Sequence, residues 1–225
     1  MDHLQHELKK EFQLERLILF TDAVFAIAIT LLAIELKVPE IHEIHEGESL
    51  DAAIGYRLAE MIPKFIGFFV SFFVIAQYWT VHHRLFGYLD DYSPKLLWAN
   101  ILYLLGIVLL PFSSAFYSDY FTSGAKVPFF FYLVNILFLA SMNTRLWRII
   151  ANPTLKLSKL DSKTTFIKYY ITRSYLVPIV FTAAFLLSFV SLWASGIAIW
   201  LMPFYGIFIK RYFKKKYNFE PERRY

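Results

Sequence analysis

Six runs of about 20 mostly apolar residues most strongly limit what this chain can fold into. The runs lie near residues 16–36, 61–81, 94–117, 127–149, 170–193 and 195–211. A helix needs about 20 apolar residues to cross a bilayer, so each run has roughly the length of one span. The hydrophobic share of 57% exceeds what one soluble core of this size needs. The sequence predicts an all-α, polytopic membrane protein with six transmembrane helices.

The connections between these runs are too short to form a separate soluble domain. The longest cover residues 37–60 and 150–169, so residues 1–225 are expected to form a single six-helix subunit. The first run is too long for a removed signal peptide, and acidic as well as basic residues precede it. Cysteine is absent, which excludes disulfides and thiolate metal sites. Proline is expected to kink the runs at four positions: Pro63, Pro111, Pro178 and Pro203.

Lysine and arginine gather on one side of the predicted membrane. Only four of the 23 belong to the opposite side: Lys37, Arg57, Lys64 and Lys126. By the positive-inside rule, both termini and the basic tail over 212–225 are cytoplasmic, and 37–60 is an extracytoplasmic loop. We expect a multi-pass plasma-membrane protein whose basic tail contacts lipid headgroups. Nucleic acid is not an expected partner, because the bases flank spans instead of forming a domain face.

The first extracytoplasmic loop is acidic. Its carboxylates are Glu35, Glu40, Glu43, Glu46, Glu48 and Asp51. One interpretation is a solvated loop, and the other is a negative vestibule that concentrates cations near the membrane. The sequence leaves both interpretations open.

Asp22 lies inside the first run, where an ionised carboxylate costs about 3 kcal/mol unless it faces protein or water. Arg16 is six residues earlier and lies about 120° away around the helix, so the two do not stack. A partner on another helix is therefore expected. Candidates at the same depth in the second and third runs are Trp79, His82, His83 and Asn100. We expect Asp22, Thr21, one histidine and Asn100 to form a hydrogen-bonded cluster across three helices.

Ile27, Leu31 and Ile34 recur on one face of the first helix, and Thr30 lies on the next stripe. This pattern alone is more typical of a lipid-facing surface. The motif around it is more specific. The motif residues are Arg16, Phe20, Thr21 and Asp22, followed by Ala26, Ile27, Thr30, Leu31 and Leu32.

This order closely resembles the first-helix signature of bacterial relatives of the endolysosomal potassium channel, the transmembrane protein 175 family. That signature reads Arg-x-x-x-Phe-Ser-Asp and then Ala-Ile-x-x-Thr-Leu-Leu, and Thr21 here replaces the usual serine. Further family positions on the second and third helices resemble Trp79, His82 or His83, Asn100 and Leu109 to Phe112. The resemblance covers about the first half of the chain.

The resemblance implies a homotetramer whose central pore is lined by the first helix, about residues 16–36. It implies an apolar constriction formed by Ile27, Leu31 and Ile34, with a modest preference for K⁺ over Na⁺. The Thr30 hydroxyl then either helps to hydrate the ion or bonds its own helix backbone. The expected partners are three further copies, membrane lipids and permeant K⁺, with no cofactor. A Thr-Val-Gly-Tyr-Gly filter is absent from the sequence.

Other functions are less consistent with the sequence. It has no nucleophile elbow, phosphate loop or paired-carboxylate site within a run, so an enzyme is not expected. The "HHR" at 82–84 is not expected to bind metal, because adjacent histidines point about 100° apart on a helix. A secondary transporter of a small cation or solute is the alternative. Transporters favour helices broken at the midplane, and the first run contains neither glycine nor proline.

Overall fold

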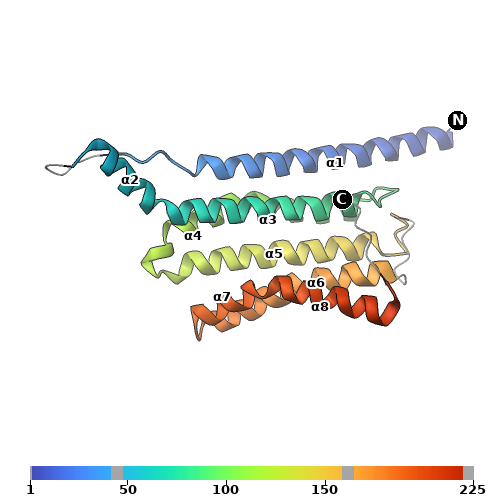
Figure 1. The fold of residues 1–225 in the computed structure, drawn as a ribbon. Coiled ribbons are helices and arrows are strands. Elements are labelled where there is room, and N and C mark those ends of the chain that lie inside the picture. The colour runs from blue at the N-terminus through green and yellow to red at the C-terminus, as the bar shows by residue number, and fades with distance from the viewer. Residues whose placement is uncertain (1, 42–47, 159–164, 220–225) are drawn as a thin grey trace.

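Long helices lying side by side form the fold of the computed structural model, which describes residues 2–41, 48–158 and 165–219 (Figure 1). The helices are α1 (Asp2–Ile34), α2 (Leu50–Glu60), α3 (Ile62–Phe86), α4 (Pro94–Asp119), the 3₁₀ helix η1 (Phe121–Ser123), α5 (Lys126–Ile150), α6 (Thr165–Ser188), α7 (Leu192–Trp200) and α8 (Met202–Tyr217). No strand occurs in the described ranges, and the all-α prediction is confirmed.

Five of these helices are long and apolar enough to cross a membrane: α1 from Lys10 onward, α3, α4, α5 and α6. The predicted sixth run, 195–211, is divided between α7 and α8, which meet at Leu201. Pro203 lies in the first turn of α8, where a missing N–H costs no hydrogen bond, so the chain starts a new helix there. Together α7 and α8 run back along α6, and α8 ends at the end of the bundle where α1 begins (Figure 1).

Two elements extend beyond the predicted spans. Helix α1 begins at Asp2, well before the apolar run. Within the expected 37–60 loop, residues 50–60 form α2, whose cap Ser49 accepts a hydrogen bond from the Ala52 N–H at 3.2 Å. Residues 42–47 of the acidic loop and 220–225 of the basic tail lie outside the described residues, and 212–217 of that tail belong to α8.

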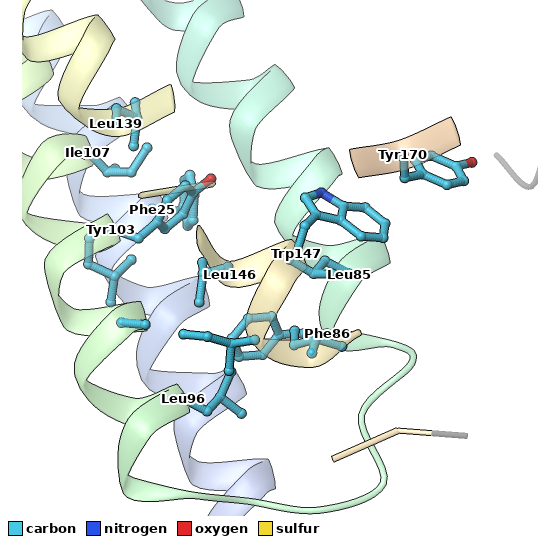
Figure 2. Close-up of a cluster of buried hydrophobic side chains, with 14 of the residues drawn as sticks. Phe25, Leu85, Phe86, Leu96, Tyr103, Ile107, Leu139, Leu146, Trp147 and Tyr170 are labelled. Atoms are coloured by element: carbon cyan, nitrogen blue, oxygen red, sulfur yellow. The ribbon is translucent and has the colours of Figure 1, made fainter. Parts of the chain in front are cut away.

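The buried core surrounds α4, which contacts α1, α3 and α5. Apolar side chains of α1, α3, α4, α5 and α6 form this core, and Figure 2 shows Phe25 of α1, Tyr103 of α4 and Trp147 of α5 among them. Trp147 stacks on Tyr170 of α6 with ring centroids 5.0 Å apart. Gly106 allows α4 and α5 to approach closely, because a Cβ there would lie 3.1 Å from the Leu139 Cβ. These contacts hold the first helix against a packed scaffold.

Pro178 interrupts the hydrogen bonding of α6, because it has no N–H to donate to the Ser174 carbonyl four residues earlier. The Thr144 hydroxyl of α5 lies 3.0 Å from that carbonyl oxygen. It also lies 3.0 Å from the Ala140 carbonyl, but an α-helical carbonyl has the amide four residues on as its partner. The hydroxyl therefore supplies the donor that Pro178 removes, as a helix in lipid requires.

Candidate functional site

One face of α1 is left uncovered by the rest of the chain. The helix packs on α3 and α4 through a buried side that includes Phe25, Ala28 and Leu32. The exposed side carries the predicted stripe, with 58% of Ile27, 38% of Leu31 and 68% of Ile34 accessible, against 3% of Leu32. The stripe is thus apolar and available to a partner.

The exposed face continues along the helix beyond this stripe. Phe20, Ala23, Ala26 and Thr30 are also exposed on it. The Thr30 hydroxyl donates to the Ile27 carbonyl at 2.9 Å, which is the backbone bond considered in the sequence analysis. Its oxygen keeps lone pairs that can still accept or coordinate.

On the opposite face, the structure brings Thr21, Asn100 and His82 together. The Asn100 amide donates to the Thr21 hydroxyl at 2.7 Å, and the Asn100 carbonyl oxygen lies 2.8 Å from the His82 Nε2. Thr21 donates in turn to the Leu17 carbonyl at 2.8 Å. All three side chains are buried, so this chain of bonds satisfies polar groups of α1, α3 and α4 where no water reaches.

Of the two adjacent histidines, His82 joins this cluster and His83 does not. The His82 ring is stacked with Phe86 at 3.9 Å and with Tyr103 at 5.2 Å between centroids. His83 is exposed and stacks on Trp79 instead. The two point in different directions because consecutive helical residues are about 100° apart.

Asp22 has a different partner from Thr21. Its carboxylate accepts a hydrogen bond from the Trp79 indole N–H at 2.9 Å, which links α1 to α3 at a part-exposed position. Arg16 is exposed, and its guanidinium lies 5.7 Å from the Phe12 ring centroid. Asp22 was expected in the cluster but bonds Trp79 instead, so the cluster contains only Thr21, His82 and Asn100. Arg16 and Phe20 also lie outside it.

The sequence analysis missed a second polar contact between α3 and α4. The Ser71 hydroxyl donates to the Ser114 hydroxyl at 2.6 Å, and Ser114 donates to the Gly67 carbonyl at 3.2 Å. The helices are so close here that a Cβ on Gly67 would overlap the Ser118 hydroxyl at 1.9 Å. Small residues four apart on both helices, Gly67 with Ser71 and Ser114 with Ser118, are the signal that could have predicted it.

The arrangement suits a pore more than a reaction centre. The buried polar side chains of Thr21, His82 and Asn100 bond one another, while the accessible face of α1 is mainly apolar and includes Thr30. The described residues contain no group of three or more His, Asp or Glu side chains that could hold a metal ion.

Comparisons with known proteins point to one family. The family model for the endosomal/lysosomal potassium channel TMEM175 matches residues 16–111, which include every residue of the polar cluster. The chain is 32% identical over 191 residues to a potassium channel of Chamaesiphon minutus, covering 84% of this chain and 91% of that one. It is 35% identical over 99 residues to a potassium channel of a Chryseobacterium species, covering 44% and 46% of the two chains.

An animal relative matches over a shorter stretch. The endosomal/lysosomal proton channel TMEM175 of Gallus gallus is 33% identical over 116 residues, covering 50% of this chain and 23% of that protein. Among solved structures, a lysosomal potassium-selective channel TMEM175 homolog from Chamaesiphon minutus superposes with a TM-score of 0.72 at 29% identity. That match covers 88% of this chain and 98% of the other. The chain belongs to the TMEM175 family of ion channels.

Proposed function

We propose that this chain is one subunit of a potassium-permeable channel with a modest preference for K⁺ over Na⁺. The observation that carries the proposal is the match along 98% of a relative that is named a potassium-selective channel. Bacterial relatives named potassium channels support it as well. The channel needs no cofactor besides the permeant ion.

Four copies of the chain surround the conduction path in this proposal. A single α1 cannot enclose a pore, and its apolar stripe is exposed in the isolated subunit. Closing four such helices around an axis buries Ile27, Leu31 and Ile34 in one narrow neck. A narrow apolar neck expels water, so it blocks ions until it widens. Weakly hydrated K⁺ then passes more readily than Na⁺ because it loses its water shell at lower cost.

The subunit lies in the plasma membrane with both termini in the cytoplasm. The distribution of Lys and Arg supports this orientation, since the end where α1 begins and α8 ends carries most of them. Lys214, Lys215 and Lys216 in the last turn of α8 are placed to contact anionic headgroups at that surface.

Ion flux through the purified protein in liposomes tests the proposal. Under opposing K⁺ and Na⁺ gradients, a K⁺-preferring channel shifts the reversal potential toward that of K⁺, and protein-free liposomes serve as the control. Current that rises nearly in proportion to the driving force supports a channel. A flux that saturates with substrate, or a reversal potential that does not change with the K⁺ gradient, would contradict it and favour a transporter.

A further inference from the structure

A cavity of about 590 Å³ lies between α4, α5 and α6, away from the exposed face of α1. Its lining includes Lys95, Arg145, Arg148, Asn152, Tyr175 and Pro178. The volume is within the range of small-molecule sites, which are typically about 300 to 1,000 Å³.

The charged side chains that line this cavity are all basic. Arg145 and Arg148 are three residues apart on the same face of α5, and Lys95 comes from the first turn of α4. No acidic side chain lines the cavity, and none of these three cations forms an ion pair with another described residue. Three uncompensated cations around one space favour an anionic ligand.

Neutral donors complete the lining. The Asn152 side-chain oxygen already accepts from the Thr154 N–H and hydroxyl, at 3.0 and 2.8 Å, which leaves its NH₂ group to donate. Tyr175 contributes a phenolic hydroxyl. Guanidinium, amide and hydroxyl donors together match the oxygens of a phosphate group.

The depth of the cavity indicates where the phosphate comes from. Arg145 is five residues before the end of α5, about 7.5 Å along the helix axis, a distance comparable to the thickness of one headgroup region. Met142, Ile149 and Pro178 give the cavity an apolar wall, and the neighbouring Ile179 of α6 is exposed. A free phosphate would gain nothing from that wall, whereas acyl chains would contact it.

We propose that this cavity binds the phosphate group of an anionic phospholipid, with Arg145, Arg148 and Lys95 holding the headgroup. The acyl chains lie against the apolar wall and the outer surface of α6. By the positive-inside assignment, the lipid belongs to the cytoplasmic leaflet. The lipid then bridges three helices of the scaffold that supports α1.

Lipid binding by the full-length, assembled protein in detergent tests this proposal by native mass spectrometry. The probes are dioctanoyl-phosphatidylglycerol, dioctanoyl-phosphatidylcholine and inorganic phosphate. Loss of one cation at a membrane surface weakens anionic lipid binding about fivefold, so R145Q/R148Q should bind phosphatidylglycerol more than tenfold more weakly. The matched control K210Q/R211Q removes two exposed charges from α8 at the same end of the bundle, and it should bind phosphatidylglycerol like the wild type.

K95Q provides a milder variant, because it removes one cation instead of two, and it should weaken phosphatidylglycerol binding about fivefold. Phosphatidylcholine should bind equally to all variants. Equal phosphatidylglycerol binding by wild type, K95Q and R145Q/R148Q would overturn the proposal. Displacement of phosphatidylglycerol by an equal concentration of inorganic phosphate would identify a free-phosphate site and also overturn it. The readout is binding, so it stands apart from whether the protein conducts potassium.

Discussion

At the scale of residues, loss of the buried cluster should destabilise the protein more than loss of the Asp22–Trp79 bond. Asn100→Ala leaves the buried His82 Nε2 without its partner, which costs about 1–3 kcal/mol, and also removes the donor to the Thr21 hydroxyl, which keeps its bond to the Leu17 carbonyl. Asp22→Ala removes one bond from Trp79, whose side chain is 39% exposed and can turn to the membrane interface. Asn100→Ala should therefore lower the unfolding temperature of the detergent-purified protein more than Asp22→Ala does.

Fluorescence-detected size exclusion after heating measures that difference. Trp98→Ala provides a control on the same helix, because Trp98 is largely exposed and should tolerate truncation. If Asn100→Ala melts at the wild-type temperature, the cluster does not contribute to stability. If Asp22→Ala assembles normally but loses current, Asp22 acts in gating.

The sequence anticipated which residue types would meet in this cluster, but not every pairing. Depth along each run placed Thr21, the two histidines and Asn100 at one level, because hydropathy fixes how far each helix is inserted. The choice of His82 over His83 depends on the rotation of α3, which is set by packing against Phe86 and Tyr103. A single sequence contains no direct record of that rotation.

At the scale of elements, the exposed face of α1 makes a prediction about current. Ile27→Ala, Leu31→Ala and Ile34→Ala each widen the proposed neck and lower its dewetting barrier, so conductance should rise and K⁺ preference fall. Leu32→Ala lies on the buried face and should instead cost about 2–5 kcal/mol of stability.

Single-channel recording under K⁺/Na⁺ gradients measures both quantities. A change in conductance for Leu32→Ala alone would mean that the pore-facing side of α1 is misassigned. If none of the four variants alters conductance or reversal potential, the first helix does not line the pore.

The close crossing of α3 and α4 leads to a prediction about the size of the side chain at position 67. Gly67→Val should prevent the helices from packing, because even a Cβ would overlap Ser118. Gly67→Ala should cost much less, since the Ser118 hydroxyl can rotate away. Gly55→Val in α2 is the matched control, as nothing lies within 4 Å of a Cβ there. The yield of folded protein after detergent extraction should fall for Gly67→Val only, and equal yields for both valine variants would contradict a tight crossing.

Spans were easier to predict than the helices outside them. Apolar runs predicted α3, α4 and α5 closely because lipid requires continuous apolar helix. The early part of α1 is polar and gave no such signal, although the Lys10–Asp91 ion pair at 2.7 Å ties it to the α3–α4 connection. The division of the last run between α7 and α8 follows from Pro203, which had been expected only to kink a span.

At the scale of the whole molecule, the proposed pore requires association. The mass of the protein in detergent should correspond to about four chains, because one six-helix unit has no axial channel of its own. Mass photometry or light scattering with detergent correction measures it. A monomer that still conducts potassium in liposomes would contradict a shared pore.

In the sequence, the positions of Lys and Arg were used only to predict the orientation of the chain in the membrane. The basic cavity was missed for that reason. Lys95, Arg145 and Arg148 each flank a span, and each was counted as one positive charge near the membrane. Only the antiparallel packing of α4 and α5 brings residues some 50 positions apart to one space. Sequence proximity could not reveal that convergence.

The bond from Thr144 to the Ser174 carbonyl fixes how α5 and α6 can move. If either helix slides along its axis or rotates by one residue, the carbonyl freed by Pro178 loses the Thr144 donor. The bond thus fixes the position of α5 relative to α6 along their axes. In the proposed channel, a rearrangement that keeps this bond moves α5 and α6 together.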